Sequence, residues 1–359
     1  MAPRTDFPPV RACIFDMDGL LINSEDAYTD VTNTILHENG RPDLPWSIKA
    51  QLQGRPGPAA GKIFREWAKL PISEEAFLER QRELQREAFK HCKPLPGVEV
   101  LLRRLSSAHT VMDAKSRARS PGGDHKRIRL ALATSSHGKN YEIKTQGMKK
   151  MFSVFPERNR IVGDDPRIPR GRGKPLPDIY LLALETINAE VTGGEDPERP
   201  ITPEECLVFE DSVPGIEAGR RAGMRVIWVP HPGLLEVYKD RVADVLAGRT
   251  GEHDETDLSH QESKPLNGSP GMPGELDDGW AEILSSLEDF NYVKYGIDWM
   301  DQRYRSEGGQ LAQPGTTDKE LEEMTAMADG KTHAAEEGSS RVQTPVPVFE
   351  TPDPVTAKV

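Results

Sequence analysis

The chain has 359 residues, with 46 Lys and Arg against 58 Asp and Glu, and its formal net charge is −12. Residues 248–279 contribute −6 and residues 308–359 contribute −5, so the remaining body is close to neutral. A neutral body has no basic surface for nucleic acid, and no apolar run reaches the roughly 18 residues of a membrane span, so we expect neither nucleic acid nor a membrane as a partner.

The first predicted element is a buried strand over residues 10–15, which ends directly before Asp16-Met17-Asp18-Gly19. Alternate residues of an extended segment point the same way, and a parallel strand delivers side chains to the crevice beyond its carboxyl end. Asp16 and Asp18 can therefore face one ligand together. One carboxylate can attack phosphorus while its neighbour moves protons, which predicts a site for an activated phosphate.

The letters Asp-x-Asp-Gly also open many calcium-binding loops, and this alternative can be checked. An EF-hand loop that starts at Asp16 requires an oxygen ligand at its fifth position, Gly at its sixth and Glu at its twelfth. Leu20, Leu21 and Ala27 stand at these positions, which argues against calcium. A purely structural Asp pair, in a helix cap or a turn, is the remaining alternative at this stage.

The interval 24–92 shows helical periodicity without a strand pattern, so we predict a helical cap inserted after the first strand. Tyr28, Val31 and Ile35 mark one face of its first helix. The chain leaves the core just past the two carboxylates and returns at residues 94–97 through a stiff, proline-containing connection. Such a cap can close over the site as a lid, and a fixed helical subdomain is the alternative.

Short apolar runs alternate with helical patterns in the rest of the core, which is typical of an α/β fold with a parallel sheet. The predicted strands are 10–15, 128–133, 207–209 and 224–229, and the predicted helices between them are 98–105, 177–188 and 214–222. We therefore expect a Rossmann-like parallel sheet core, formed by residues 10–23 and 93–247, with the all-helical cap inserted into it.

Four further segments differ from this core in composition. Residues 107–126 are rich in Ser, Gly, Arg, Lys and His and are predicted to be a flexible insert. Residues 248–279 are predicted to be a disordered acidic insert, and apolar residues at helical spacing predict a C-terminal helical segment over 280–307 that packs on the core. Residues 308–359 are predicted to be a disordered acidic tail, which could recruit an unidentified partner.

Three further groups of polar residues are expected at the same edge of the sheet as Asp16. Thr134 ends the second core strand and, with Ser135, offers hydroxyl and backbone N–H groups to an anion. Lys174 lies in a Gly- and Pro-rich segment before a helix, and its ammonium suits both a phosphate oxygen and an attacking carboxylate. Glu210 and Asp211 end the next strand in the way that Asp16 ends the first.

Four acids are thus predicted to converge at one edge. Mg²⁺ prefers hard oxygen ligands, binding through one or two carboxylates and a phosphate while it keeps several waters. Asp16, Asp211 and the backbone carbonyl of Asp18, with Glu210 as a further ligand, would suffice. Burial of four acids without a cation would cost on the order of several kcal/mol, so we expect Mg²⁺ as the cofactor.

The cysteine count indicates the compartment. Cys13, Cys92 and Cys206 are too few and too scattered for a disulfide framework, and two of them fall in predicted buried strands. Such residues behave as small hydrophobic side chains in a reducing compartment. Residues 1–9 show no basic region followed by an apolar stretch, so we expect a cytoplasmic protein.

Taken in chain order, these motifs resemble those of haloacid dehalogenase-like (HAD) phosphatases whose helical cap follows the first strand. The resemblance covers roughly residues 10–229, and the stretch 280–297 resembles the closing helix of the family. It implies a role for each residue singled out above, with Asp16 as nucleophile, Asp18 as general acid and base, Thr134 and Lys174 as phosphate holders, and Glu210 and Asp211 on the Mg²⁺ side.

Within the superfamily, three segments look most like the pseudouridine-5′-phosphatase branch, namely 16–21, 163–166 and 207–219. The expected substrate is a small phosphorylated metabolite, such as a nucleoside or sugar monophosphate. The cap selects it, and Gly54, Arg55 and Lys62 are the candidate contacts. Salt bridges on a helix surface are the alternative role for the charged side chains of this set.

Three other functions remain open at this stage. A sugar-phosphate phosphatase differs only in the alcohol part of its substrate. A mutase similar to β-phosphoglucomutase shares the core, but mutases of that group carry a His where Tyr28 stands here, which favours hydrolysis. A binding or regulatory protein with a vestigial core is the non-enzyme alternative, and the complete set of polar groups argues against it.

Overall fold

The computed structural model describes residues 3–55, 57–111, 126–194, 197–250 and 273–299, and of residues 57–59 the backbone alone. Most of the predicted insert 107–126, most of the predicted acidic insert 248–279 and the whole predicted tail 308–359 lie outside these ranges. In the described ranges, no helix has both the length and the apolar character needed to cross a membrane.

Six parallel strands form the central sheet, and this confirms the predicted α/β class. Their order is β4-β3-β1-β5-β6-β7, so the first strand of the chain lies in the middle. The strands are β1 Ala12–Phe15, β3 Arg129–Ala133, β4 Arg160–Ile161, β5 Cys206–Glu210, β6 Arg225–Trp228 and β7 Ala281–Ile283. Phe15 pairs with Leu132 on one side and Phe209 on the other, so the residues that follow β1, β3 and β5 meet at one edge.

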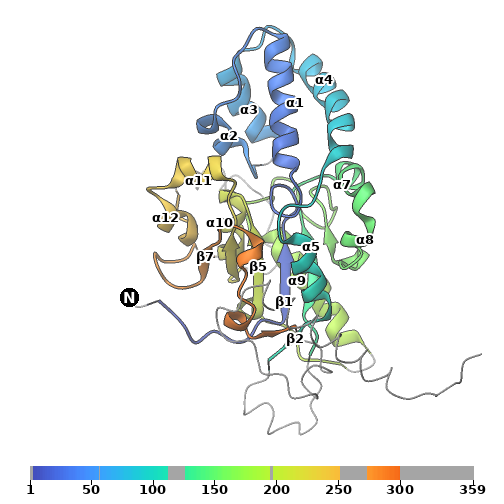
Figure 1. Ribbon diagram of the computed structural model, residues 1–359, viewed down its shortest axis with the longest axis vertical. Helices are drawn as coiled ribbons and strands as arrows, with labels where there is room; N and C mark the ends of the chain where they lie inside the picture. Colours follow the sequence, from blue (N-terminus) through green and yellow to red (C-terminus); the bar gives the residue numbers. More distant parts are fainter. Residues whose placement is uncertain (1–2, 56, 112–125, 195–196, 251–272, 300–359) are drawn as a thin grey trace, which may run out of the picture. The chain divides into compact units, whose positions relative to one another are not determined.

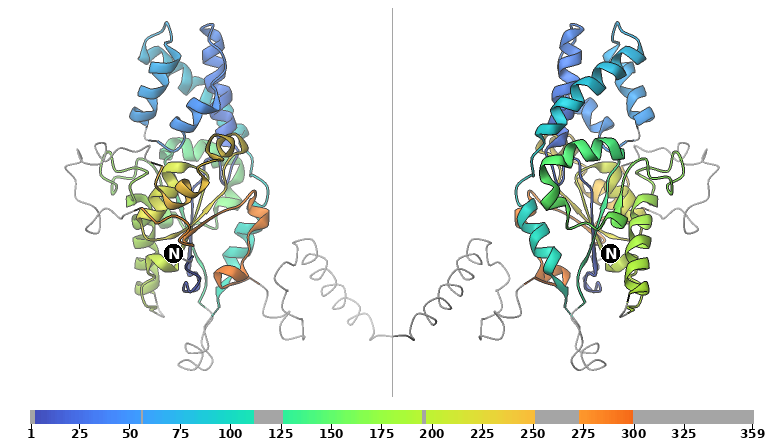
Figure 2. Two further views of the ribbon diagram at one scale, coloured as in Figure 1. Left: turned by 90° about the vertical axis from the view of Figure 1, so that its left-hand side faces the viewer. Right: turned by 90° about the vertical axis from the view of Figure 1, so that its right-hand side faces the viewer.

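Helices cover both faces of this sheet, as the views in Figure 2 show. Ile14 and Val208 pack with α9 and α10 on one face, whereas Phe15 and Phe209 pack with α5 on the other. The period of two along each strand places alternate residues on opposite faces, and because both faces are covered the strands are almost continuously apolar. The core helices are α5 Val98–Ser107, α7 Gly138–Thr145, α8 Lys149–Phe152, α9 Asp178–Gly193, α10 Val213–Arg221, α11 Pro232–Tyr238 and α12 Val242–Ala247.

The cap consists of four α-helices and a 3₁₀ turn between β1 and α5, grouped together in Figure 1. Leu36, Phe64 and Ala68 form a small apolar core of its own. Ser73 caps the last long helix, since its side chain accepts a hydrogen bond from the Ala76 N–H. The elements are α1 Ser24–Glu38, α2 Trp46–Leu52, α3 Gly57–Ala68, α4 Glu74–Ala88 and η1 Phe89–His91.

The prediction of a C-terminal helical segment over residues 280–307 is wrong for its described part, residues 280–299. The chain instead adds the edge strand β7 beside β6, and it continues through two 3₁₀ turns to the short strand β8. Leu287 and Phe290 are buried as expected, but a spacing of three residues fits a 3₁₀ turn as well as an α-helix. The remaining short elements are β2 His109–Thr110, η2 Gln146–Met148, η3 Glu157–Asn159, η4 Pro203–Glu205, η5 Leu287–Asp289, η6 Val293–Tyr295 and β8 Ile297–Asp298.

Candidate active site

Asp16 and Lys174 form the centre of the site. Asp16 directly follows β1, and its N–H donates to the Phe209 carbonyl at 3.0 Å, which continues the ladder with β5. The Lys174 ammonium donates to Asp16 Oδ1 at 2.5 Å, to Glu210 Oε1 at 2.6 Å and to the Ala133 carbonyl at 3.2 Å. One buried cation therefore joins groups from the ends of β1, β3 and β5.

The charge of Lys174 does not fully offset the effects that disfavour the carboxylate form of Asp16. Burial raises the pKa of Asp16 to about 7; the Lys174 charge opposes this rise, and the charges of Glu210 and Asp18 add to it. Burial alone would lower the pKa of Lys174, but the charges of Asp16 and Glu210 raise it, so the ammonium stays protonated at neutral pH. A divalent cation beside Asp16 would favour its carboxylate form.

The Glu210 carboxylate accepts hydrogen bonds from groups of the protein on both of its oxygens. Its Oε1 accepts from Lys174 and from the Tyr180 hydroxyl at 2.6 Å, and its Oε2 accepts from the N–H groups of Asp211 and Ser212 and from the Ser212 hydroxyl, each at 3.0 Å. A carboxylate has about four lone-pair sites, and five protein donors occupy them. These contacts favour Glu210 as the residue that holds Lys174, and its role as a metal ligand stays a prediction.

Hydrogen-bond donors from three segments of the chain surround Asp18. Its Oδ1 accepts from Ser24 Oγ at 2.5 Å and forms an ion pair with Lys144, and its Oδ2 accepts from Ser136 Oγ at 2.7 Å. Burial acts to raise the pKa of Asp18, but the Lys144 charge and these hydrogen bonds outweigh burial and lower it. The carboxylate is thus held in one orientation by side chains of α1, of α7 and of the loop that follows β3.

Thr134 and Ser135 directly follow β3, which pairs with β1. Thr134 is fully buried, and its hydroxyl accepts from the Ser136 N–H at 3.0 Å and donates to Asp18 Oδ2 at 3.3 Å. Ser135 is exposed, and its backbone packs against Gly163, where a Cβ atom would lie 2.0 Å from the Ser135 carbonyl oxygen. The loops after β3 and β4 therefore fix each other in place.

Asp211 faces both the core and the cap. It is 2% exposed, and its Oδ2 accepts from the Gln53 side-chain amide at 2.5 Å. A Cβ atom on Gly19, whose φ is +75°, would lie 2.2 Å from the same oxygen. Burial raises the pKa of Asp211 well above its usual range, and the charges of Glu210, Asp16 and Glu25 add to the rise.

The carboxylates of Asp16 and Asp211 fit Mg²⁺, which needs only one or two protein carboxylates as ligands. Asp16 and Asp211 are both buried, their pKa values are raised, and the contacts described for Asp211 include an amide but no cation. In the part of the chain that is described, no cluster of three or more His, Cys, Asp or Glu side chains is arranged around a metal position. The fit therefore rests on two carboxylates and a backbone carbonyl, with phosphate and water as the other ligands.

A family model for haloacid dehalogenase-like hydrolases matches residues 10–223, which is more than half of the chain. The chain belongs to this family. A probable pseudouridine-5′-phosphatase of Saccharomyces cerevisiae is 38% identical over 288 residues, covering 80% of this chain and 98% of that protein. A (DL)-glycerol-3-phosphatase of Arabidopsis thaliana is 33% identical over 233 residues, covering 64% of this chain and 83% of that protein.

A solved structure of a HAD family hydrolase from Deinococcus radiodurans, with bound phosphate and sodium, has 25% identity to this chain and a TM-score of 0.44. The match covers 63% of this chain and 82% of the Deinococcus radiodurans chain. The family model and the curated relatives make this chain a phosphatase of the HAD family, and phosphatases of this family generally use Mg²⁺.

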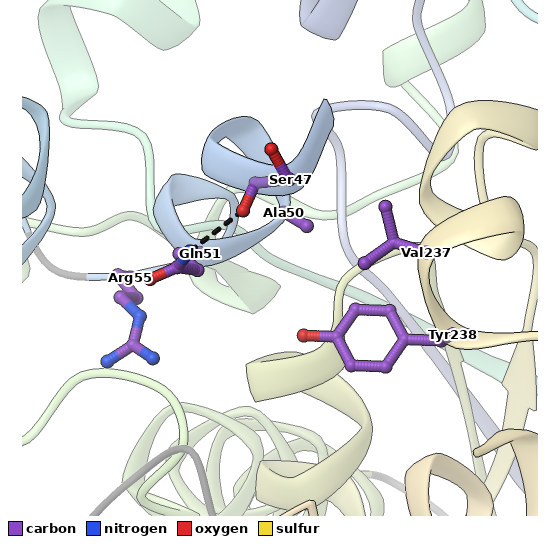
Figure 3. Close-up of a pocket in the computed structure, with 6 residues that line it drawn as sticks. All are labelled: Ser47, Ala50, Gln51, Arg55, Val237 and Tyr238. Atoms are coloured by element: carbon purple, nitrogen blue, oxygen red, sulfur yellow. Dashed lines mark hydrogen bonds between the residues drawn. The ribbon is translucent and has the colours of Figure 1, made fainter. Parts of the chain in front are cut away.

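The cap residues predicted to contact the substrate lie in different surroundings. Gly54 approaches the core, because a Cβ atom on it would lie 2.6 Å from the Ser212 hydroxyl oxygen. Arg55 borders a pocket of about 380 Å³ between α2 and α11, which Figure 3 shows in close-up, and Lys62 is exposed on α3. The other residues that border this pocket are Ser47, Ala50, Gln51, Val237 and Tyr238.

Two residues at the HAD site were not found from the sequence. Gln53 brings an amide from the cap to Asp211, and Lys144 brings an ammonium from α7 to Asp18. Gln53 precedes the positive-φ Gly54, which is a weak signal that the chain turns toward the core there. Lys144 lies in a helix rich in charged and polar residues, and nothing in its immediate sequence distinguishes it from a surface lysine.

Proposed function

We propose that this phosphatase hydrolyses a small phosphate monoester through an aspartyl-phosphate on Asp16, with pseudouridine 5′-phosphate as the leading candidate substrate. The observation that carries the proposal is the Lys174 ammonium, shared by Asp16 and Glu210 where β1 and β5 end. A buried carboxylate beside a buried cation suits attack on an anionic phosphoryl group, because the cation offsets repulsion between the two anions.

In the first step, an Asp16 oxygen attacks phosphorus in line with the ester bond, and the bond from phosphorus to the ester oxygen breaks. Lys144 and the hydrogen bonds to Asp18 lower its pKa, so the bound anionic phosphate has to raise that pKa before Asp18 carries a proton and gives it to the leaving alkoxide. Thr134 and the backbone N–H groups after β3 bind phosphoryl oxygens, and Lys174 stabilises the charge that develops on them. The products of this step are the free alcohol and the acyl phosphate on Asp16.

In the second step, water attacks phosphorus and the bond to the Asp16 oxygen breaks. Asp18, now a carboxylate, takes a proton from the attacking water, so inorganic phosphate is released and Asp16 is regenerated. Mg²⁺, when bound by Asp16, Asp211 and the Asp18 carbonyl, supplies positive charge that favours approach of the anionic phosphate. The hydrogen-bonded clamp around Asp18 keeps its carboxylate in one position through both steps.

Two substrate classes can be separated by measuring phosphate release. The yeast relative supports pseudouridine 5′-phosphate, and the Arabidopsis relative supports glycerol 3-phosphate. We expect kcat/KM for pseudouridine 5′-phosphate to exceed that for uridine 5′-phosphate, glycerol 3-phosphate and glucose 6-phosphate by at least about 10²-fold, because polar substrate contacts discriminate strongly. Equal values across the panel would contradict the proposed substrate, and no release with any monoester would contradict the proposed reaction.

The metal assignment is tested by the change Gly19→Ala. The new Cβ would lie 2.2 Å from Asp211 Oδ2, so Asp211 must move. We expect the Mg²⁺ concentration for half-maximal activity to rise roughly 10- to 100-fold, as for other changes beside metal ligands. The rise in Tm that Mg²⁺ produces in the wild type, measured without substrate, should shrink correspondingly.

Gly40→Ala is the matched control for this experiment. Gly40 has a similar φ of +65°, but a Cβ atom on it would meet nothing within 4 Å. Both variants therefore carry the backbone strain of a positive φ, and only Gly19→Ala displaces Asp211. An unchanged Mg²⁺ requirement in Gly19→Ala, or an equal shift in both variants, would contradict the assignment of Asp211 to the metal.

A further inference from the structure

Lys144 is a buried cation that the proposed reaction does not use. It lies on α7 and is 1% exposed, which is unusual for a lysine. Its ammonium forms the ion pair with Asp18 and donates to Ser136 Oγ at 2.8 Å and to the Tyr28 hydroxyl at 2.9 Å. The three hydrogen bonds of the ammonium are thereby all made, one of them to the proposed acid and base.

The same ammonium touches the cap at both ends of the cap sequence. Its nitrogen lies 4.5 Å from the ring centroid of Tyr28 on α1 and 4.5 Å from that of Phe89 on η1. The two rings pack edge to face with centroids 4.9 Å apart. A core lysine is therefore held between the helix by which the chain enters the cap and the turn by which it leaves.

Stability alone gives a weak reason for this arrangement. A buried ion pair contributes little net stability compared with apolar side chains of similar volume, because both ions lose their hydration. Asp18 also accepts from Ser24, Ser136 and Thr134, so its carboxylate has neutral partners in addition to the lysine. The feature that apolar residues could not reproduce is the link between the Asp18 carboxylate and the aromatic pair of the cap.

We propose that Lys144 is a positioning residue, which holds the Asp18 carboxylate in its catalytic orientation only while Tyr28 and Phe89 of the cap are packed against it. The inference rests on the proposed role of Asp18 as acid and base. Proton transfer requires the carboxyl group within hydrogen-bonding distance of the reacting oxygen, and a misplacement of about 1 Å can reduce the rate by about 10²-fold. Lys144 thus connects the packing of the cap to the geometry of proton transfer.

A double-mutant cycle between Lys144 and Asp18 tests this role. The variants are Lys144→Met, Asp18→Asn and the double variant, assayed with the best substrate of the panel, with unfolding in urea recorded for each. We expect Lys144→Met to lower kcat by roughly 10²-fold with KM within about threefold, and Asp18→Asn to lower it by roughly 10²- to 10⁴-fold. The double variant should be no slower than Asp18→Asn alone, because Lys144 acts through Asp18.

A lysine that only joins α7 to the cap would give a different pattern. In that case Lys144→Met would lower the rate by the same factor in both backgrounds, and the two losses would multiply. Lys139→Met is the matched control, since Lys139 is exposed on the same helix, and its kcat should equal that of the wild type. Multiplying losses, or wild-type kcat in Lys144→Met, would overturn the inference.

A second variant covers the case in which Lys144→Met does not fold. Tyr28→Phe removes the hydroxyl that accepts from Lys144 and keeps the ring beside it. We expect kcat to fall about three- to tenfold in the wild type and not at all in the Asp18→Asn background, and equal falls in the two would overturn the inference. Full activity of Asp18→Asn itself would instead refute the proposed function, so the two failures are distinguishable.

Discussion

Asp16→Asn is expected to abolish turnover while the protein remains folded. The amide has nearly the shape of the carboxylate, but it cannot form the acyl phosphate through which the proposed reaction proceeds. Loss of a nucleophile from a set of groups that act together reduces kcat by on the order of 10⁴-fold or more. Release of inorganic phosphate, followed over hours at high enzyme concentration, measures the residual rate.

The fold of this variant is protected by the remaining contacts of Lys174. Glu210 still accepts from the ammonium at 2.6 Å, so the cation does not lose its only carboxylate. We expect the free energy of unfolding in urea to stay within about 2 kcal/mol of the wild type. Asp240→Asn, at an exposed position, is the control for an acid-to-amide change and should be fully active. Wild-type-like rates in Asp16→Asn would contradict the nucleophilic role.

The parts of the fold that could be predicted from the sequence are those in which a local pattern determines the structure. The apolar runs before Asp16, Thr134 and Glu210 form β1, β3 and β5, because a strand covered on both faces must be almost continuously apolar. Parallel neighbours end at one edge, so the meeting of Asp16 and Glu210 at Lys174 follows from their places at strand ends.

The parts that could not be predicted depend on partners remote in the sequence. The segment 281–283 becomes β7 because β6 offers an unpaired edge, and this edge exists only in the folded sheet. Glu210 has the chemistry of a metal ligand, and only the folded structure reveals the donors that occupy its oxygens. Lys144 reaches Asp18 across 126 positions of the chain, a distance at which no local periodicity carries information.

The cap side chain that contacts the site could likewise not be predicted from the sequence. Gly54, Arg55 and Lys62 are the predicted cap contacts, yet the cap side chain that bonds a site carboxylate is the uncharged Gln53. Its other amide atom, Oε1, is buried and has no hydrogen-bond partner among the described residues. Since a buried acceptor without a partner is costly, we expect this oxygen to accept from water or substrate when the site is filled.

Lys174→Met is expected to abolish activity and, unlike Asp16→Asn, to destabilise the fold. The change leaves Asp16 and Glu210 as neighbouring buried acids without the ammonium that lies 2.5 and 2.6 Å from them. Removal of one partner from a buried ion pair typically costs about 3–5 kcal/mol, because the remaining charge is uncompensated. Urea unfolding should therefore show a loss of this size, and phosphate release should fall below detection.

The double variant Lys174→Met/Glu210→Gln separates these two effects. Removal of the second buried charge should restore at least about half of the lost free energy of unfolding, since one acid and no cation then remain. Activity should stay absent, because no ammonium stabilises the charge on the phosphoryl oxygens. Lys150→Met, at an exposed position on α8, should change the free energy of unfolding by less than about 0.5 kcal/mol. Recovery of activity together with stability would show that Lys174 serves the fold alone, and its proposed part in holding phosphate would then be wrong.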